Sequence, residues 1–286
     1  MNADGEHMTT LFNHRLIKII SLVLLCCLVL FAVIPFLWIC ITAFKTPEEL
    51  YTATPVFIPS NPTIENFIYV LKRGSFGLYF RNSIFVSLGT TVVSLVVSLL
   101  AGYGFSRYRF PLHNWLLFGF LIMQMVPGAL LILPLFQALK TLGLMDSIWA
   151  LVLANTTFAI PLCTWLLKGF FDQIPVDLEE ASMIDGCSRF GAMWRVILPL
   201  AVPGIIASAI YVFIGSWDEL VFAITFTSSD AVRTLPVGLS RFISSYEIQW
   251  NQLSAATVLA TVPVLILFMF IQKYVAQGLV SGAVKG

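Results

Sequence analysis

The sequence predicts an all-α membrane protein with six transmembrane helices and a short helix between the fourth and fifth of them. The first observation is composition: 58% of the 286 residues are hydrophobic and 11% are charged, with a mean hydropathy of +0.90, whereas about 25% of residues are charged in an average soluble domain. The second is a series of long apolar runs along the chain. The third is the polar segment 172–195, which separates two of these runs.

Each predicted span holds about 20 mostly apolar residues, because a helix of that length crosses the ~30 Å hydrocarbon core with its backbone groups paired internally. The first run is too long for the apolar region of a signal peptide, which has about 7–15 residues, so we expect it to remain as a helix. An even number of spans places both termini on one side. The spans are expected at residues 17–44, 84–106, 114–137, 148–171, 196–216 and 253–272.

The short loop 107–113 indicates the orientation of the chain in the membrane. It contains two arginines and a histidine, and positive residues in short loops favour the cytoplasmic side. Both termini are then cytoplasmic, as is the segment 172–195, while the segments 45–81 and 218–251 face outward.

Several functions are disfavoured by composition. A net charge of +1 argues against nucleic-acid binding, and the five cysteines show no spacing typical of metal sites or disulfides. The histidines have no partners that would suggest acid–base or metal chemistry. No phosphate-binding G-x-x-x-x-G-K-[ST] loop is present, so we expect a non-enzymatic chain that binds no cofactor or metal.

The polar segment contains the stretch IPVDLEEASMIDG, which predicts a helix of about two turns. Asp177 is placed to cap its start, and Gly186 can adopt the left-handed conformation that ends a helix. A second helix is expected after Ser188. Since two turns are not stable alone in water, the helix either packs on loops of its own chain or docks into a groove of another protein.

The same stretch resembles the EAA motif of ATP-binding-cassette importer permeases, written EAA, three residues, G, nine residues, I-x-L-P. Here Glu180, Ala181 and Ser182 are followed by Gly186 and then by the segment 196–199, VILP. Ser182 and Val196 depart from the motif, but they preserve small size and β-branching respectively.

Further stretches resemble the maltose-type carbohydrate permeases, and in particular the smaller, MalG-like subunit of the pair. The similarity runs from residue 44 to residue 286. Its segments are FKTPEEL at 44–50, ENF at 65–67, RNS at 81–83, WDEL at 217–220, RTLPVGL at 233–239 and QKYVAQGLVSGAVKG at 272–286.

This resemblance implies the type I importer permease fold, in a bacterial-type inner or plasma membrane. It also implies a second, MalF-like permease subunit, two cytoplasmic ATPase subunits and an extracytoplasmic sugar-binding protein; ATP and Mg are expected on the ATPases. The short helix becomes the coupling helix, which docks on an ATPase and transmits its closure. By resemblance, the docking residues are Leu178, Glu180, Ala181, Ser182, Asp185 and Gly186.

Trp217, Asp218 and Glu219 follow the fifth predicted span. A carboxylate at the bilayer centre would cost about 2.5–3.5 kcal/mol on insertion scales. The acidic pair therefore lies at the outer interface or lines a cavity, where Trp217 would offer a stacking surface for a sugar ring. Both interpretations remain open from sequence.

Two polar segments receive roles from the resemblance. The segment 227–250 corresponds to a loop that reaches toward the binding protein and helps to keep sugar from rebinding, although a simple connecting loop is the alternative. The C-terminal segment 277–286 would ordinarily be disordered. By resemblance it contacts the ATPases, with Gly282 and Lys285 as its marked residues.

The function expected from sequence is therefore that of a transmembrane subunit of a sugar importer, forming half of the pathway for a disaccharide, oligosaccharide or sugar derivative. The alternative is a self-contained secondary transporter or channel. Such carriers usually show repeated halves and ion sites within the membrane, and neither feature is visible in this sequence.

Overall fold

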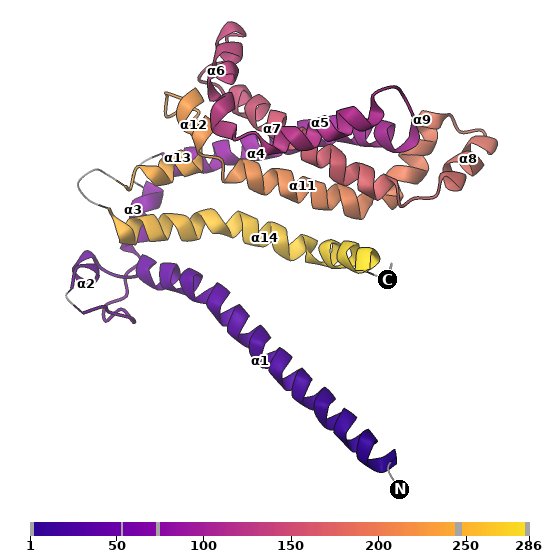
Figure 1. Ribbon diagram of the computed structural model, residues 1–286. Coiled ribbons are helices and arrows are strands. Elements are labelled where there is room, and N and C mark those ends of the chain that lie inside the picture. Colours follow the sequence, from indigo (N-terminus) through magenta and orange to yellow (C-terminus); the bar gives the residue numbers. More distant parts are fainter. Residues whose placement is uncertain (1–2, 53, 73–74, 244–247, 284–286) are drawn as a thin grey trace. The chain divides into compact units, whose positions relative to one another are not determined.

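The computed structural model describes residues 3–52, 54–72, 75–243 and 248–283. This part of the chain is helical, without strands; its only β feature is an isolated bridge between Ile243 and Ile248. The chain divides into two compact units, one made of residues 1–70 and 242–259, the other of residues 71–241 and 260–286. An all-α membrane fold is thus confirmed (Figure 1).

Four helices among the described residues are long and apolar enough to cross a membrane on their own. Their apolar stretches are Ile17–Ala43, Phe76–Arg107, Ile148–Asp172 and Trp250–Phe270. They lie in α1 (Ala3–Ala43), α4 (Phe76–Arg107), α7 (Ile148–Phe171) and α14 (Trp250–Ala283).

Two further spans are each made of helices that meet at a sharp bend. The first joins α5 (His113–Met125) to the 3₁₀ turn Gly128–Leu131 and α6 (Ile132–Thr141), at 100°. The second joins α9 (Arg189–Ala192), the π turn Met193–Ile197 and α10 (Leu198–Leu200) to α11 (Val202–Trp217), at 77°.

Proline explains both bends, which fall within the predicted spans 114–137 and 196–216. Pro127 holds Val126 in an extended conformation with ψ of 119°, because the ring of a proline disfavours helical backbone in the residue before it. Pro203 lies in the first turn of α11, where no backbone N–H is needed for a hydrogen bond within the helix. The same proline cannot donate to the preceding turn, so α10 does not continue into α11 as one straight helix. With each bent pair counted as one span, the total is six.

In the first unit, which also contains α2 (Pro47–Leu50), the end of α1, α3 (Glu65–Lys72) and the start of α14 meet around one amide. Asn66 Nδ2 donates to the carbonyl oxygens of Ala43 and Lys45, at 2.8 and 2.9 Å, and Asn66 Oδ1 accepts from Asn251 Nδ2 at 2.9 Å. The buried Lys45 ammonium lies 4.1 Å from the centre of the Trp38 ring. The segments FKTPEEL and ENF are therefore packed against each other.

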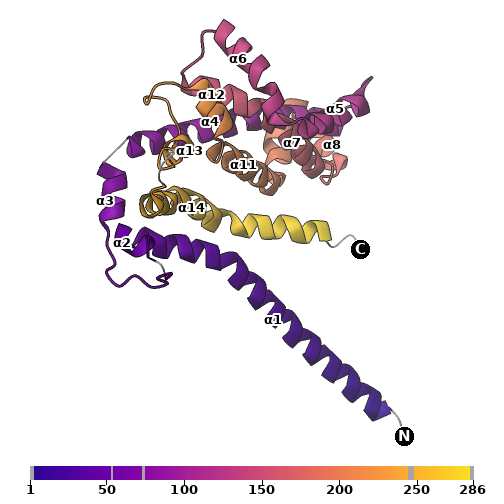
Figure 2. The ribbon, with the colours of Figure 1, turned by 60° about the vertical axis from the view of Figure 1, so that its left-hand side comes forward.

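In the second unit, α4, α7 and α11 pack side by side (Figure 2). Gly102 permits the close approach of α4 to α7, since a Cβ there would lie 3.1 Å from the backbone nitrogen of Lys168. At one end of these helices, Phe171, Leu167 and Ile197 form a hydrophobic cluster. At the other end, a second cluster includes residues of α12 (Val221–Phe226) and α13 (Leu235–Ser240).

Candidate functional site

The predicted coupling helix is present as α8 (Val176–Ile184), at the end of the second unit that also carries α9 (Figure 1). Its expected end is confirmed: Gly186 has φ of +90°, and Gly186 N and Cys187 N donate to the carbonyls of Met183 and Ser182. Ser188 caps α9 by accepting from Gly191 N at 3.1 Å.

The expected cap at the start of α8 is wrong. The helix begins directly after Pro175, whose extended backbone has ψ of 136°, and no side chain caps it. Asp177 instead lies in the first turn, where a negative charge interacts favourably with the helix dipole.

Glu179 attaches α8 to the end of α4. Its Oε1 accepts from the Tyr103 hydroxyl, and its Oε2 lies 3.0 Å from Arg107 Nε. The Arg107 and Glu179 side chains are only 4% and 3% exposed, and Arg107 Nη2 also donates to the Ile174 carbonyl at 3.0 Å. Charged hydrogen bonds in a buried place are both strong and directional, so they fix the position of α8 on α4.

The predicted docking residues face away from this attachment. Leu178, Glu180, Ala181, Asp185 and Gly186 are exposed. Ser182 differs, because it is half-buried and its hydroxyl donates to the Glu179 carbonyl of its own helix at 2.8 Å. Nearby apolar side chains are also exposed, including Ile184 at 87% and Trp194 at 56%. Such a patch is typical of an interaction surface.

The sequence reasoning missed Tyr103, Arg107 and Glu179 as a group. A signal was present in the double glutamate: the EAA motif accounts for Glu180 and leaves Glu179 without a role. The short loop after α4 drew attention to Arg107 only as a marker of orientation. Nothing in the spacing of 72 residues between Arg107 and Glu179 predicts that they meet.

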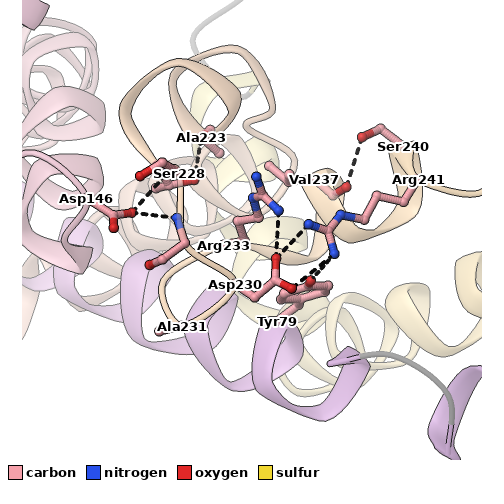
Figure 3. A network of polar contacts seen from close by, with 12 residues as sticks. Tyr79, Asp146, Ala223, Ser228, Asp230, Ala231, Arg233, Val237, Ser240 and Arg241 are labelled. Atoms are coloured by element: carbon pink, nitrogen blue, oxygen red, sulfur yellow. Dashed lines mark hydrogen bonds and ion pairs between the residues drawn. The ribbon is translucent and has the colours of Figure 1, made fainter.

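At the opposite end of the unit, the loop after α12 is held by charged and backbone contacts (Figure 3). The Asp230 carboxylate lies 2.6 Å from both Arg233 and Arg241, and Arg241 also donates to the Tyr79 hydroxyl at 2.6 Å. Asp146 Oδ1 accepts from Ser228 N at 2.8 Å and from Ser229 N at 3.0 Å. These backbone hydrogen bonds lower the pKa of Asp146.

The RNS stretch at 81–83, in the second turn of α4, also bonds to this loop. Asn82 Nδ2 donates to the carbonyls of Ala231 and Arg233, at 2.8 and 3.0 Å, and the Ser83 hydroxyl accepts from Leu235 N at 2.8 Å. The loop therefore follows a defined path over α4.

Trp217 offers no free ring face, so the structure argues against sugar stacking on it. Its side chain is 3% exposed, stacked on Phe213 at 5.8 Å and edge-on to Phe80 at 5.7 Å. Asp218 is exposed. Glu219 accepts from Phe222 N and Ala223 N at 2.7 and 3.0 Å and so holds the start of α12. Burial raises the pKa of Glu219, and these two hydrogen bonds lower it by a smaller amount.

A cavity of about 190 Å³ lies beside Glu219. Residues of α4, α5, α7 and α11 line it, together with the first residues of the segment around α12. Among the described residues, no cluster of three His, Cys, Asp or Glu side chains could hold a metal ion. Of the two tail residues, Gly282 lies in α14 and Lys285 lies outside the described residues.

Comparison with known proteins gives consistent matches over most of the chain. Residues 94–281 match the family described as binding-protein-dependent transport system inner membrane component. The sulfoquinovosyl glycerol transport system permease protein SmoH of Agrobacterium fabrum is 37% identical over 88% of both chains. The trehalose/maltose transport system permease protein MalG of Thermococcus litoralis is 34% identical over 95% of this chain and 97% of that protein.

The fold is also found in a solved structure. A chain from the crystal structure of a bacterial transporter that imports the acidic polysaccharide alginate superimposes with a TM-score of 0.79. The match covers 92% of this chain and 97% of that chain, at 21% identity. The overall fold of this chain is therefore one already seen in an ATP-binding-cassette importer.

Proposed function

This chain belongs to the family of inner membrane components of binding-protein-dependent transport systems, and we propose that it is a permease subunit of an ATP-driven sugar importer. Members of the family are non-catalytic, membrane-spanning subunits of transporters. The relatives are named for sulfoquinovosyl glycerol, for trehalose and maltose, and for diacetylchitobiose. A disaccharide, oligosaccharide or sugar derivative is therefore the proposed cargo.

The observation that carries the mechanism is the attachment of α8 to α4 through Glu179. An exposed helix that is fixed to a membrane-spanning helix by buried charged bonds can transmit a displacement. When the ATPase partner closes and moves α8, α4 follows as a rigid body, and the α4–α7–α11 group turns with it. In this way closure of the ATPases is converted into alternating access of the sugar pathway.

Docking on the ATPase uses the exposed side of α8, through Leu178, Glu180, Ala181, Asp185 and Gly186. The Ser182 hydroxyl already donates to the Glu179 carbonyl, so Ser182 contributes to docking through its small size. Two ATPase subunits that bind ATP and Mg, a MalF-like second permease and an extracytoplasmic binding protein complete the transporter. The termini and α8 lie on the cytoplasmic side, and the C-terminal residues Gly282 and Lys285 reach the ATPases.

The loop 227–241 lies at the outer side in this arrangement and contacts the binding protein. Its support from Asn82, Ser83 and Asp146 favours a preformed contact surface, because a loop that is already ordered loses less conformational entropy on binding.

The test is purification of the chain from detergent with its genomic neighbours expressed. We expect a second permease and an ATPase to co-purify, and ATP hydrolysis in proteoliposomes to rise when a sugar-loaded binding protein is added. A panel of neutral and acidic oligosaccharides would identify the cargo. Recovery of a transport-competent homo-oligomer without an ATPase would overturn the proposal in favour of a self-contained transporter.

A further inference from the structure

The cavity beside Glu219 has the features of a ligand site at a break in a membrane helix. Gln124 lines it one residue before α5 ends at the 100° bend. Transporters commonly place substrate sites at discontinuous helices, because irregular backbone at membrane depth is tolerated where it lines a cavity. Phe158 and Phe222, with ring centres 5.3 Å apart, form an apolar part of the lining.

The polar lining presents three acceptor side chains, Gln124, Asn155 and Glu219, beside the hydroxyls of Thr90, Tyr211 and Ser216. Gln124 Nε2 donates to the Phe158 carbonyl at 3.0 Å, and Asn155 Nδ2 donates to the Leu151 carbonyl at 2.9 Å. These bonds orient both amides, and within the described residues neither amide oxygen accepts a hydrogen bond. Each Glu219 carboxylate oxygen accepts one backbone N–H and has capacity for another donor.

The charge of the lining disfavours acidic sugars. Glu219 is the only carboxylate in the lining, and no Lys, Arg or His of the described residues lines the cavity. A sugar hydroxyl can donate to the free oxygens of Gln124, Asn155 and Glu219. A uronate or sulfonate group can only accept, and it would also meet the negative charge of Glu219 without a compensating cation.

The size of the cavity limits how much of a ligand it holds. At about 190 Å³ it is smaller than the roughly 300–1,000 Å³ typical of sites for drug-sized ligands. It therefore has room for one sugar ring and not for a whole oligosaccharide.

We propose that this cavity is a subsite, on this subunit, for a single sugar unit without an acidic group, held through its hydroxyls by Gln124, Asn155, Tyr211 and Glu219. The proposal rests on the proposed function, since it assumes that a sugar passes through this chain. It goes beyond that function by assigning a contact between sugar and this subunit and by stating which sugars that contact rejects.

Gly215 gives a direct test. It lines the cavity, is exposed, and a Cβ there would meet no atom within 4 Å, so Gly215→Cys places a thiol at the subsite without removing a proposed contact. The assembled transporter is treated with a maleimide reagent in the presence of maltotriose, cellotriose, xylotriose or trigalacturonate. Peptide mass spectrometry then gives the alkylation rate of each cysteine separately.

We expect at least one neutral trisaccharide to slow alkylation of Gly215→Cys severalfold and trigalacturonate to have no effect. Gly77→Cys is the matched control, because Gly77 is also an exposed helical glycine with open space around it and lies outside the cavity lining. Its rate should not change. Equal protection by trigalacturonate, or no protection by any of the four sugars, would overturn the subsite.

A second variant reads out transport. Asn155→Leu removes one proposed contact and should lower the sugar transported per ATP hydrolysed roughly two- to twelvefold, the factor for one ordinary hydrogen bond. Thr157→Val is its control, since Thr157 makes the same kind of bond to the carbonyl four residues earlier but does not line the cavity. Unchanged transport per ATP in Asn155→Leu would contradict the subsite, whereas failure of every loaded binding protein to stimulate ATP hydrolysis would contradict the proposed function.

Discussion

The Arg107 guanidinium and the Glu179 carboxylate lie 3.0 Å apart, almost fully buried, and join two helices that are 72 residues apart in sequence. A buried ion pair adds little stability compared with a well-packed apolar pair, but removal of one partner leaves the other charge buried alone. The pair therefore acts mainly as a positional constraint on α8.

Arg107→Ala should release α8 from α4. Loss of one partner of a buried pair costs about 3–5 kcal/mol, so we expect the ATPase to co-purify weakly and sugar uptake to be lost. Arg109→Ala is the control, because among the described residues no hydrogen bond or ion pair joins Arg109 to α8, and its side chain only approaches His113, at 3.5 Å. If Arg107→Ala retained uptake at the level of Arg109→Ala, the attachment through Glu179 would not be part of the coupling.

Gly186→Ala should weaken the docking surface through backbone strain. With φ of +90°, an L-residue at this position costs about 1–2 kcal/mol in the left-handed region, and the end of α8 shifts to relieve it. Gly169→Ala is the matched control, since Gly169 is in the helix α7 and a Cβ there meets nothing within 4 Å. Uptake per assembled transporter should fall only in Gly186→Ala; a similar fall in both variants would mean that the conformation of Gly186 has no special role.

Gly204→Ala should destabilise the packing of α11 on α7. A Cβ at Gly204 would clash with the Phe170 ring, and overpacking of this kind typically costs about 1–3 kcal/mol. Thermal unfolding in detergent should therefore occur at a lower temperature than in the parent chain. Gly104→Ala, where a Cβ meets nothing within 4 Å, should unfold at or slightly above the parent temperature. An unchanged unfolding temperature in Gly204→Ala would show that Phe170 moves without cost.

The loop 227–241 should keep its support from Asp146 down to acidic pH. Hydrogen bonds from Ser228 N and Ser229 N lower the pKa of Asp146, so the folded state favours the carboxylate. The contribution to stability is therefore fully present above the unfolded pKa of about 3.9 and is lost only as the pH falls through the lower, folded pKa.

Hydrogen exchange can check this directly. After correction for the intrinsic pH dependence of exchange, protection of the Ser228 and Ser229 amides should be constant between neutral pH and about pH 5 and should decrease only at more acidic pH. In Asp146→Asn the protection should be weaker, and its pH dependence should be absent. Loss of protection near neutral pH in the parent chain would point to a different titrating group.

Periodicity and motif spacing predicted the parts of the fold that depend on local chemistry. The run 17–44 covers only the apolar part of α1, which begins at Ala3, whereas the run 148–171 has the same bounds as α7. Gly186 was identified as a helix end because the left-handed conformation is a property of one residue. Pro127 and Pro203 indicate kinks in two of the spans, but bends as sharp as 100° and 77° could not be predicted, because how far a proline bends a membrane helix depends on the neighbouring helices.

Long-range contacts explain the remaining differences at the site. One of the two interpretations open from sequence gave Trp217 a free ring face, but whether an aromatic side chain is free or packed depends on residues such as Phe80, 137 positions earlier in the chain. Glu219 was correctly suspected of facing a cavity as one of two alternatives, but the amides of Gln124 and Asn155 that share this cavity could not be assigned to it from sequence.

Asn82 and Ser83 hold the loop 227–241 only through its main chain: two carbonyl oxygens and one N–H, at Ala231, Arg233 and Leu235. Those groups are present whatever the side chains are. These three hydrogen bonds therefore do not select the side chains of the loop, so an exposed position such as Ala231 can be substituted while the bonds are retained. A loop transplanted between relatives would need Asn82 and Ser83 on α4, Asp146 before α7, and its own Asp230 ion pairs to keep this path.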